Sequence, residues 1–172
     1  MGFTDDFKIT FDPVDLLFSA GAATVAFMVL HFVHLQLAAQ GFTAMCPPLG
    51  AVAVILFAAP GIPAAKPYNV AIGFLAGSAA AYGIYTGLGE NFLPAFGGTR
   101  AVMVGSAIAA MKITNSVHPP MGAYAVLLAD VPAMKALGAK YILCPGLTGA
   151  LTLLAVQFLF TQIKKALKVK QN

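Results

Sequence analysis

The chain has 172 residues and a net charge of +4, and 59% of its residues are hydrophobic while only 9% are charged. Soluble domains carry roughly 25% charged residues. A chain with so few charges cannot cover a water-exposed surface. The composition therefore excludes an ordinary soluble domain, gives no pattern typical of a nucleic-acid partner, and favours an integral membrane protein.

Four apolar stretches are long enough to cross a bilayer, which takes about 20 residues of helix. In chain order they cover residues 15–40, 69–88, 99–117 and 141–163. The segment before the first stretch lacks the basic start of a signal peptide, so we expect none. The sequence predicts an all-α membrane protein with a single domain over residues 1–172.

The first long stretch contains His31 and His34, which lie on one face of a helix because they are three residues apart. Such a pair can ligate haem or chlorophyll. It can equally make hydrogen bonds to neighbouring helices near a membrane face. Both interpretations stay open at this point.

One phrase occurs twice between the long stretches. Residues 46–58 read CPPLGAVAVILFA and residues 118–130 read HPPMGAYAVLLAD, aligned without a gap. Proline suits the first turn of a helix, and it keeps the preceding residue out of the helical region. We therefore expect two half-helices that begin at the Pro-Pro pairs, each preceded by a non-helical residue, Cys46 or His118.

The two phrases divide the chain into repeated halves, about residues 15–88 and 99–165, joined by a turn-rich segment at 89–98. If each half-helix and its approach complete a crossing, the chain crosses six times and the halves are inverted; otherwise it crosses four times. We favour six. Interrupted helices at matching positions of two repeats are typical of the binding site of a transporter.

The last stretch is followed by a basic tail, residues 164–172, which contains four lysines. Positively charged flanks stay on the cytoplasmic side of a membrane, or on the stromal side in a plastid. We expect both termini to lie on that side.

Lys112 is the most informative single residue, because a lysine near the middle of a membrane span costs roughly 2.5–3.5 kcal/mol and marks functional sites. Asn115 and Ser116 follow on the same helical face, and His118 precedes the second half-helix. The first N–H groups of a helix lack intrahelical acceptors and attract anions. This group predicts a site for a small anion, although Lys112 can also anchor at an interface and His118 can cap a broken helix.

The predicted substrate-binding residues come from both phrases and their flanks. They are Lys112, Asn115, Ser116, His118, Pro119, Pro120, Met121, Gly122, Ala123, Pro47, Pro48, Gly50 and Asn69. Asn69 also suits the N-cap of the second long stretch. Because Cys46 stands where the second phrase has His118, we expect the specific chemistry in the second half and shape from the first.

The sequence gives no enzyme constellation. No paired carboxylates lie inside the apolar stretches, and the two cysteines, Cys46 and Cys144, make no metal cluster. We expect both to be small apolar residues at helix starts, with a disulfide still open. The prediction is therefore no catalytic residue, no metal and no cofactor.

The second phrase, extended to SVHPPMGA, resembles the signature that gives the HPP family of integral membrane proteins its name. The first phrase and its continuation resemble the family's other characteristic stretch, which ends in glutamine, proline, arginine, asparagine and valine. In this chain Lys66 replaces the glutamine and Tyr68 the arginine, and the other three match. The resemblance covers about residues 44–73 and 104–128.

This resemblance implies a small multi-spanning protein of bacteria, algae and plants, with members linked to nitrite transport, including across the chloroplast envelope. It carries the family's His-Pro-Pro onto His118, Pro119 and Pro120. The predicted function is a transporter or channel for a small inorganic anion, nitrite in particular, held at the half-helix N-termini. The predicted location is a plastid envelope or thylakoid membrane in a photosynthetic eukaryote, and the inner membrane in a bacterium.

The expected partners are the anion, the lipid bilayer and further copies of the chain, because a chain this short encloses little of a pathway alone. The alternative is a structural or accessory subunit of a larger membrane complex, with His31 or His34 holding a pigment. That reading accounts for a small body rich in glycine and alanine, but not for Lys112 or the repeated half-helices.

Overall fold

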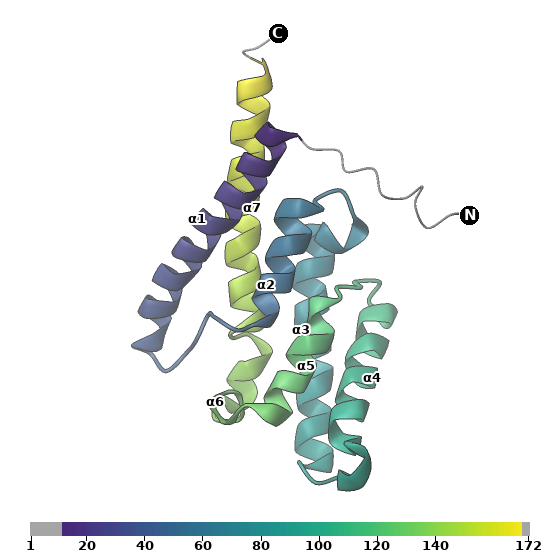
Figure 1. Ribbon diagram of the computed structural model, residues 1–172. Coiled ribbons are helices and arrows are strands. Elements are labelled where there is room, and N and C mark those ends of the chain that lie inside the picture. The colour runs from purple at the N-terminus through teal and green to yellow at the C-terminus, as the bar shows by residue number, and fades with distance from the viewer. Residues whose placement is uncertain (1–11, 170–172) are drawn as a thin grey trace, which may run out of the picture.

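The computed structural model describes residues 12–169, and these form helices joined by short turns, without a strand (Figure 1). The elements are α1 (Pro13–Ala38), α2 (Pro48–Ala53), η1 (Val54–Ala58), η2 (Pro63–Ala65), α3 (Pro67–Leu88), η3 (Pro94–Phe96), α4 (Gly98–Ile113), α5 (Pro120–Asp130), α6 (Pro132–Lys135), η4 (Gly138–Ile142) and α7 (Gly146–Val169). The predicted all-α class is confirmed. The end of the basic tail, residues 170–172, lies outside the described residues.

Prolines set the start of most of these helices, as the sequence predicts for both phrases. Proline lacks an N–H and has a preset φ, so the first helical position suits it. α1 is capped in addition by Asp12, whose carboxylate accepts hydrogen bonds from the N–H groups of Val14 and Asp15. α3 likewise begins at Pro67, with Lys66 at the cap position.

The predicted N-cap role of Asn69 is wrong, because α3 begins two residues earlier than expected. Asn69 lies in the first turn of α3, and its side-chain amide donates to the carbonyl of Pro63 at 2.8 Å. It therefore ties the start of α3 to the turn η2.

Three helical segments have the length and composition to cross a membrane: Pro13–Ala38, Pro67–Leu88 and Gly138–Leu167. The stretch predicted over residues 99–117 forms α4, which has 16 residues and a length of about 24 Å. The four residues that follow it leave the helix and lead into the second phrase. The prediction of four long spans is therefore not confirmed.

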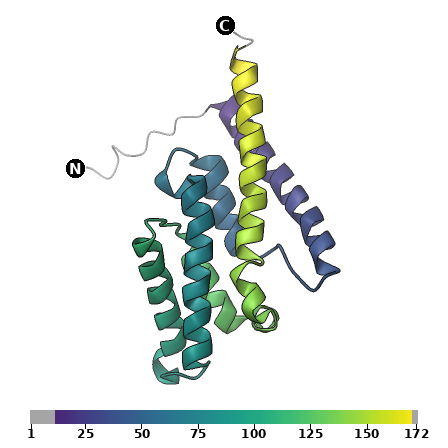
Figure 2. The ribbon, with the colours of Figure 1, turned by 180° about the vertical axis from the view of Figure 1, so that it is seen from behind.

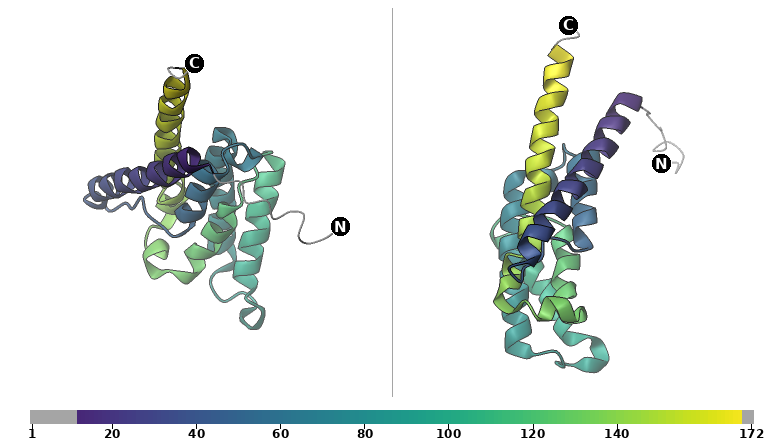
Figure 3. Two further views of the ribbon diagram at one scale, coloured as in Figure 1. Left: turned by 45° about the horizontal axis from the view of Figure 1, so that its top comes forward. Right: turned by 90° about the vertical axis from the view of Figure 1, so that its left-hand side faces the viewer.

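Successive helices run alternately along the long axis of the molecule, as Figures 1 and 2 show. α1 descends beside α7, and α3 packs against α4, α5 and α7. The start of α1 and the end of α7 lie at the same end of the molecule. α1 leans away from the other helices (Figure 3), and only 17% of an apolar 18-residue segment of it is buried inside the protein.

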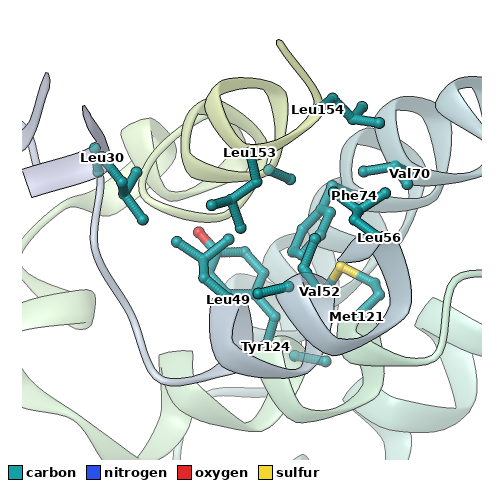
Figure 4. Packing of buried hydrophobic residues seen from close by; sticks show 14 of the residues in the cluster. Leu30, Leu49, Val52, Leu56, Val70, Phe74, Met121, Tyr124, Leu153 and Leu154 are labelled. Carbon is teal, nitrogen blue, oxygen red and sulfur yellow. The ribbon is translucent and has the colours of Figure 1, made fainter. Parts of the chain in front are cut away.

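The core lies where the half-helices meet α3 and α7. Leu49 and Val52 of α2 face Phe74 of α3, Met121 of α5 and Leu153 of α7 (Figure 4), and all five are fully buried. Helices approach closely here at glycines. A Cβ at Gly149 of α7 would lie 2.3 Å from Leu49 and 2.6 Å from the carbonyl oxygen of Ala44.

The two phrases bury the same face of their half-helices. Leu49, Val52 and Leu56 are buried in the first, and the aligned residues Met121, Tyr124 and Leu128 are buried in the second. Their spacing of three or four residues is that of one helical stripe. The repeated sequence therefore corresponds to a repeated packing pattern.

Candidate functional site

The candidate site lies where the two half-helices begin. α2 and α5 start at about the same height in the middle of the molecule and run in opposite directions (Figures 1 and 3). They contact one another, and α5 also packs on α3 and α4. The N-terminal ends of two broken helices are thus brought together inside the fold.

His118 occupies the turn between α4 and α5 and is fully buried, with 0% of its surface exposed. Its ring nitrogen Nδ1 lies 3.0 Å from the carbonyl oxygen of Ala64. A carbonyl only accepts, so Nδ1 carries a proton and donates it to this bond. The ring also lies 5.3 Å from the ring of Phe74, measured between centroids. Residues from two separate segments, η2 and α3, therefore fix the imidazole.

The other ring nitrogen, Nε2, has no hydrogen-bond partner. It is the only buried side-chain nitrogen or oxygen in the described part of the chain with this property. Most buried polar atoms in proteins are paired, and an exception indicates a ligand, a water or a functional role. With its proton on Nδ1, the neutral ring presents a lone pair at Nε2.

The turn that carries His118 lies directly on the backbone of α3 at Gly73. A Cβ at Gly73 would come within 2.6 Å of the carbonyl oxygen of Ser116 and 2.9 Å of the Cβ of His118. No larger residue leaves room for this approach. The backbone N–H of His118 donates to the sulfur of Met111 at 3.4 Å, so α4 holds the turn from the other side.

The predicted cluster of Lys112, Asn115 and Ser116 is only partly brought together. Ser116 is buried and its hydroxyl lies 2.6 Å from that of Thr114. Lys112 and Asn115 are exposed, and Lys112 forms no ion pair within residues 12–169. The shared helical face is lost because α4 ends at Ile113 and Asn115 adopts a left-handed conformation, with φ of 49°.

The first-turn N–H groups predicted to be unpaired are in fact paired in both half-helices. Those of Leu49 and Gly50 donate to Cys46 and Pro47 at 3.1 and 3.0 Å, and those of Met121 and Gly122 donate to His118 and Pro119 at the same distances. Bonds to the residue three positions back tighten the first turn of many helices. The prediction of free donors is wrong for these four, although the helix dipole remains.

The remaining predicted residues divide by burial. Pro48 and Pro120 are buried, whereas Pro47, Pro119, Gly50 and Ala123 are exposed. Gly50 and Gly122 border open space, because a Cβ built at either meets nothing within 4 Å. Both half-helices therefore keep an unobstructed side beside their first turn.

A cavity of about 400 Å³ lies beside the start of α2, between α1 and Cys46. Its walls are apolar, with Phe27, Leu30 and Met45 among them. Cys46 is half-buried and both cysteines are free thiols. The first phrase therefore offers space without the buried nitrogen that the second provides.

A second cavity, of about 100 Å³, lies between α1 and α7 near the end of η1. Lys164 forms an ion pair with Asp15 at this cavity, and Gln157 and Thr161 add polar groups. Sequence reasoning missed it because its two sides are almost 150 residues apart. The only signal in the sequence was that Asp15 begins the first long stretch and Lys164 directly follows the last one.

His34 does not have the geometry of a pigment ligand. Its Nδ1 accepts a hydrogen bond from the backbone N–H of Ala44 at 3.4 Å and lies 3.2 Å from the hydroxyl of Thr43. A histidine that binds a metal through Nε2 usually donates from Nδ1. The imidazole rings of His31 and His34 are 6.4 Å apart, so His34 is better explained as a tie between α1 and the approach to α2.

Comparison with known proteins places these features in one family. The family model for the HPP transmembrane region matches residues 9–169. A transmembrane protein of Dictyostelium discoideum is 29% identical over 136 residues, which cover 76% of this chain and 42% of that relative. The chain thus spans less than half the length of that relative, and no solved structure matches it. Because the match takes in both Pro-Pro phrases and all the long helices, the chain belongs to the HPP family of transmembrane proteins.

Proposed function

We propose that this protein is a transporter or channel for a small inorganic anion, nitrite in particular. The observation that carries the proposal is the buried imidazole of His118, whose Nε2 has no partner at the point where the two half-helices begin. A polar atom held without a partner inside an otherwise apolar core is costly unless a ligand uses it.

The surroundings of His118 suit a negative charge. α5 has 11 residues, and a helix N-terminus carries roughly half a positive charge. α2 points its N-terminal end at the same region from the opposite direction. No carboxylate forms an ion pair with His118 within the described residues. The anion would thus meet two positive dipole ends and an imidazole.

α2 and α5 run in opposite directions and bury matching faces, as the corresponding helices of two inverted repeats would. In transporters of that design, the substrate lies near the bilayer midplane at the interface of the repeats. We place the anion there, beside His118 and the unobstructed sides of Gly50 and Gly122. The proposed pathway then runs along the faces that the half-helices leave open.

Lys112 takes a different place in this proposal from the one that the sequence suggests. Its side chain is exposed on α4 and makes no ion pair among residues 12–169, so it is free to act on anions at a mouth of the pathway. An exposed charge raises the local concentration of counter-ions and the rate of encounter. We propose that Lys112 attracts the anion and that His118 binds it.

We also propose that the working unit is a homo-oligomer in the membrane of a plastid or a bacterium. The outer face of α1 exposes large apolar side chains, such as those of Leu17, Met28 and Phe32. Lipid or a second copy can cover such a face. Crosslinking in the native membrane at single cysteines on this face distinguishes the two.

The experiment that tests transport is nitrite uptake into proteoliposomes that contain the purified wild-type protein. We expect uptake that saturates with nitrite concentration and that unlabelled nitrite suppresses more strongly than chloride. Protein-free vesicles of the same lipid are the control, because nitrous acid crosses bare lipid. Uptake no faster than in those vesicles, from a protein shown to be folded, contradicts the proposal.

A further inference from the structure

We infer that His118 binds the anion only together with a proton, so that each anion crosses the membrane with one H⁺. This inference rests on the proposed function and adds that transport of the anion is coupled to transport of a proton. It is argued from the hydrogen bond at Nδ1, from the unpartnered Nε2, and from the fact that no carboxylate among residues 12–169 forms an ion pair with His118.

The carbonyl oxygen of Ala64 fixes which ring nitrogen carries the proton. It lies 3.0 Å from Nδ1 and can only accept, so Nδ1 must donate. The neutral ring therefore turns a lone pair, not an N–H, toward whatever lies at Nε2. Nitrite, nitrate and chloride also present only lone pairs. No hydrogen bond forms between them and the neutral ring.

One added proton removes this conflict. If the proton is placed on Nε2, the imidazolium donates from Nδ1 to Ala64 and from Nε2 to the anion. If it is placed on the anion, nitrous acid donates to the lone pair of Nε2. Both descriptions contain one imidazole, one proton and one anion, and their net charge is zero. No bond other than that to the proton is made or broken.

The described residues around His118 give an imidazolium no other counter-charge. Ala64, Gly73, Phe74 and Met111 contact the turn or the ring, and none of them titrates. The titratable groups on the elements packed around His118 are Tyr68, Tyr82 and Tyr85 on α3 and Tyr124 on α5. The cations are Arg100 and Lys112 on α4, with Lys66 just before α3. Asp130, at the far end of α5, is paired with Arg100.

Proton and anion therefore depend on each other at this site. A buried imidazolium without a partner pays a large desolvation cost, and so does an anion beside a lone pair. Each ligand removes the penalty of the other, which makes their binding reciprocal. Because the loaded site is neutral, a pH gradient drives the transport cycle and membrane voltage does not.

The test measures protons and nitrite in the same proteoliposomes, with a pH-sensitive dye in the lumen and the background of protein-free vesicles subtracted. We expect nitrite entry to acidify the lumen and to accelerate when the lumen is made alkaline. The rate of entry should not change when a membrane voltage is imposed with potassium and valinomycin. Nitrite entry that follows voltage and leaves lumen pH unchanged overturns the coupling while transport stands. No entry above background overturns the proposed function and the coupling together.

His118→Asn assigns the coupling to this residue. Its amide N–H keeps a donor for Ala64 near the position of Nδ1, while Nε2 is removed. We expect uptake to fall roughly tenfold or more, within the usual range of coupling between two ligands, and the remainder to lose its response to the pH gradient. A folded His118→Asn protein that retains the full pH-driven rate overturns the inference.

Discussion

Each Pro-Pro phrase forms a half-helix that begins at its second proline. The phrases differ in the residue before the Pro-Pro pair, which is Cys46 in the first and His118 in the second. Cys46 is half-buried at an apolar cavity beside α1, whereas His118 is fully buried and hydrogen-bonded. Its acceptor, Ala64, lies in the segment that follows the first phrase, so one half of the chain holds the imidazole of the other. In the proposed function, the repeated half-helices give the site its shape, while His118, which has no counterpart in the first phrase, gives it its chemistry.

The anchoring of the two half-helices differs in the same way. Tyr124 of α5 stacks on Tyr141 of η4, with ring centroids 4.4 Å apart, and each hydroxyl donates to the backbone carbonyl of the other residue. The first phrase has Val52 at the position of Tyr124 and so lacks this anchor. The half-helix that carries His118 is thus the more firmly held.

The largest effect is expected from a substitution at Gly73, on which the turn that carries His118 packs. Gly73→Ala places a Cβ 2.6 Å from the carbonyl oxygen of Ser116. Overpacking costs about 1–3 kcal/mol, and we expect the upper end because backbone has to move. Thermal unfolding in detergent measures the loss, and we expect nitrite uptake to fall with it.

Gly122→Ala is the matched control in the second half-helix, since its new Cβ meets nothing within 4 Å. An alanine in place of a helical glycine gains about 0.5–1 kcal/mol. We therefore expect a slightly higher Tm. Equal Tm values for Gly73→Ala and Gly122→Ala would show that the turn is not seated on α3 as described.

The anchor of α5 gives the next largest effect. Tyr141→Phe removes the hydrogen bond from its hydroxyl to the carbonyl of Tyr124, and a buried hydrogen bond contributes about 0.5–1.5 kcal/mol. Tyr82→Phe is the control, because the hydroxyl of Tyr82, on α3, makes no hydrogen bond to the described residues. Denaturation of both variants measures the difference. A Tyr141→Phe protein as stable as Tyr82→Phe contradicts the anchoring role.

Lys112→Ala sharpens the distinction between attracting and binding an anion. We expect nitrite entry to slow a few-fold at low ionic strength and to recover in high salt, because salt screens an exposed charge. Lys66→Ala, at the exposed lysine of the first half, tests whether the effect is specific to α4. Complete loss of uptake at every salt concentration would place Lys112 in the binding site itself.

The smallest effect concerns the connectors. Glu90 accepts a hydrogen bond from the hydroxyl of Tyr85 at 2.6 Å and lies 2.9 Å from the ammonium of Lys135. These partners hold the pKa of Glu90 below its ordinary value of about 4.5. The unfolded chain thus protonates first as pH falls, so the contribution to stability is present above about pH 4.5 and is lost as pH falls through the lower pKa of the folded state.

Glu90→Gln should therefore lower Tm slightly near pH 7 and have no effect in strong acid. The change is small because the carboxylate is exposed. Lys66, on the connector of the first half, forms no ion pair within residues 12–169, so Lys66→Gln should show no pH-dependent difference. A Tm difference for Glu90→Gln that persists in strong acid contradicts this account.

Sequence reasoning predicted the half-helices well because proline acts locally. Proline restricts its own φ and the conformation of the residue before it, whatever surrounds them. The helix starts at Pro48 and Pro120 can therefore be predicted from the Pro-Pro pairs and the residues next to them. The buried faces of the two phrases are equally local, since both repeat at helical spacing. These features need no knowledge of the rest of the chain.

The contents of the site depend on contacts between distant segments, and there the predictions were weaker. The face shared by Lys112, Asn115 and Ser116 required a helix through residue 117, and the turn that begins after Ile113 removed it. The bond from His118 to Ala64 joins residues 54 positions apart, and no local pattern announces it. Likewise, the close approach of Ser116 and His118 to Gly73 became visible only in the fold.

We propose that the imidazole of His118 binds the anion and that Cys46, at the aligned position of the first phrase, does not. The most direct test is nitrite uptake by His118→Ala and by Cys46→Ala, measured at equal amounts of folded protein. We expect His118→Ala to reduce saturable uptake to the level of protein-free vesicles and Cys46→Ala to transport like the wild type. Equal uptake by the two variants would contradict it.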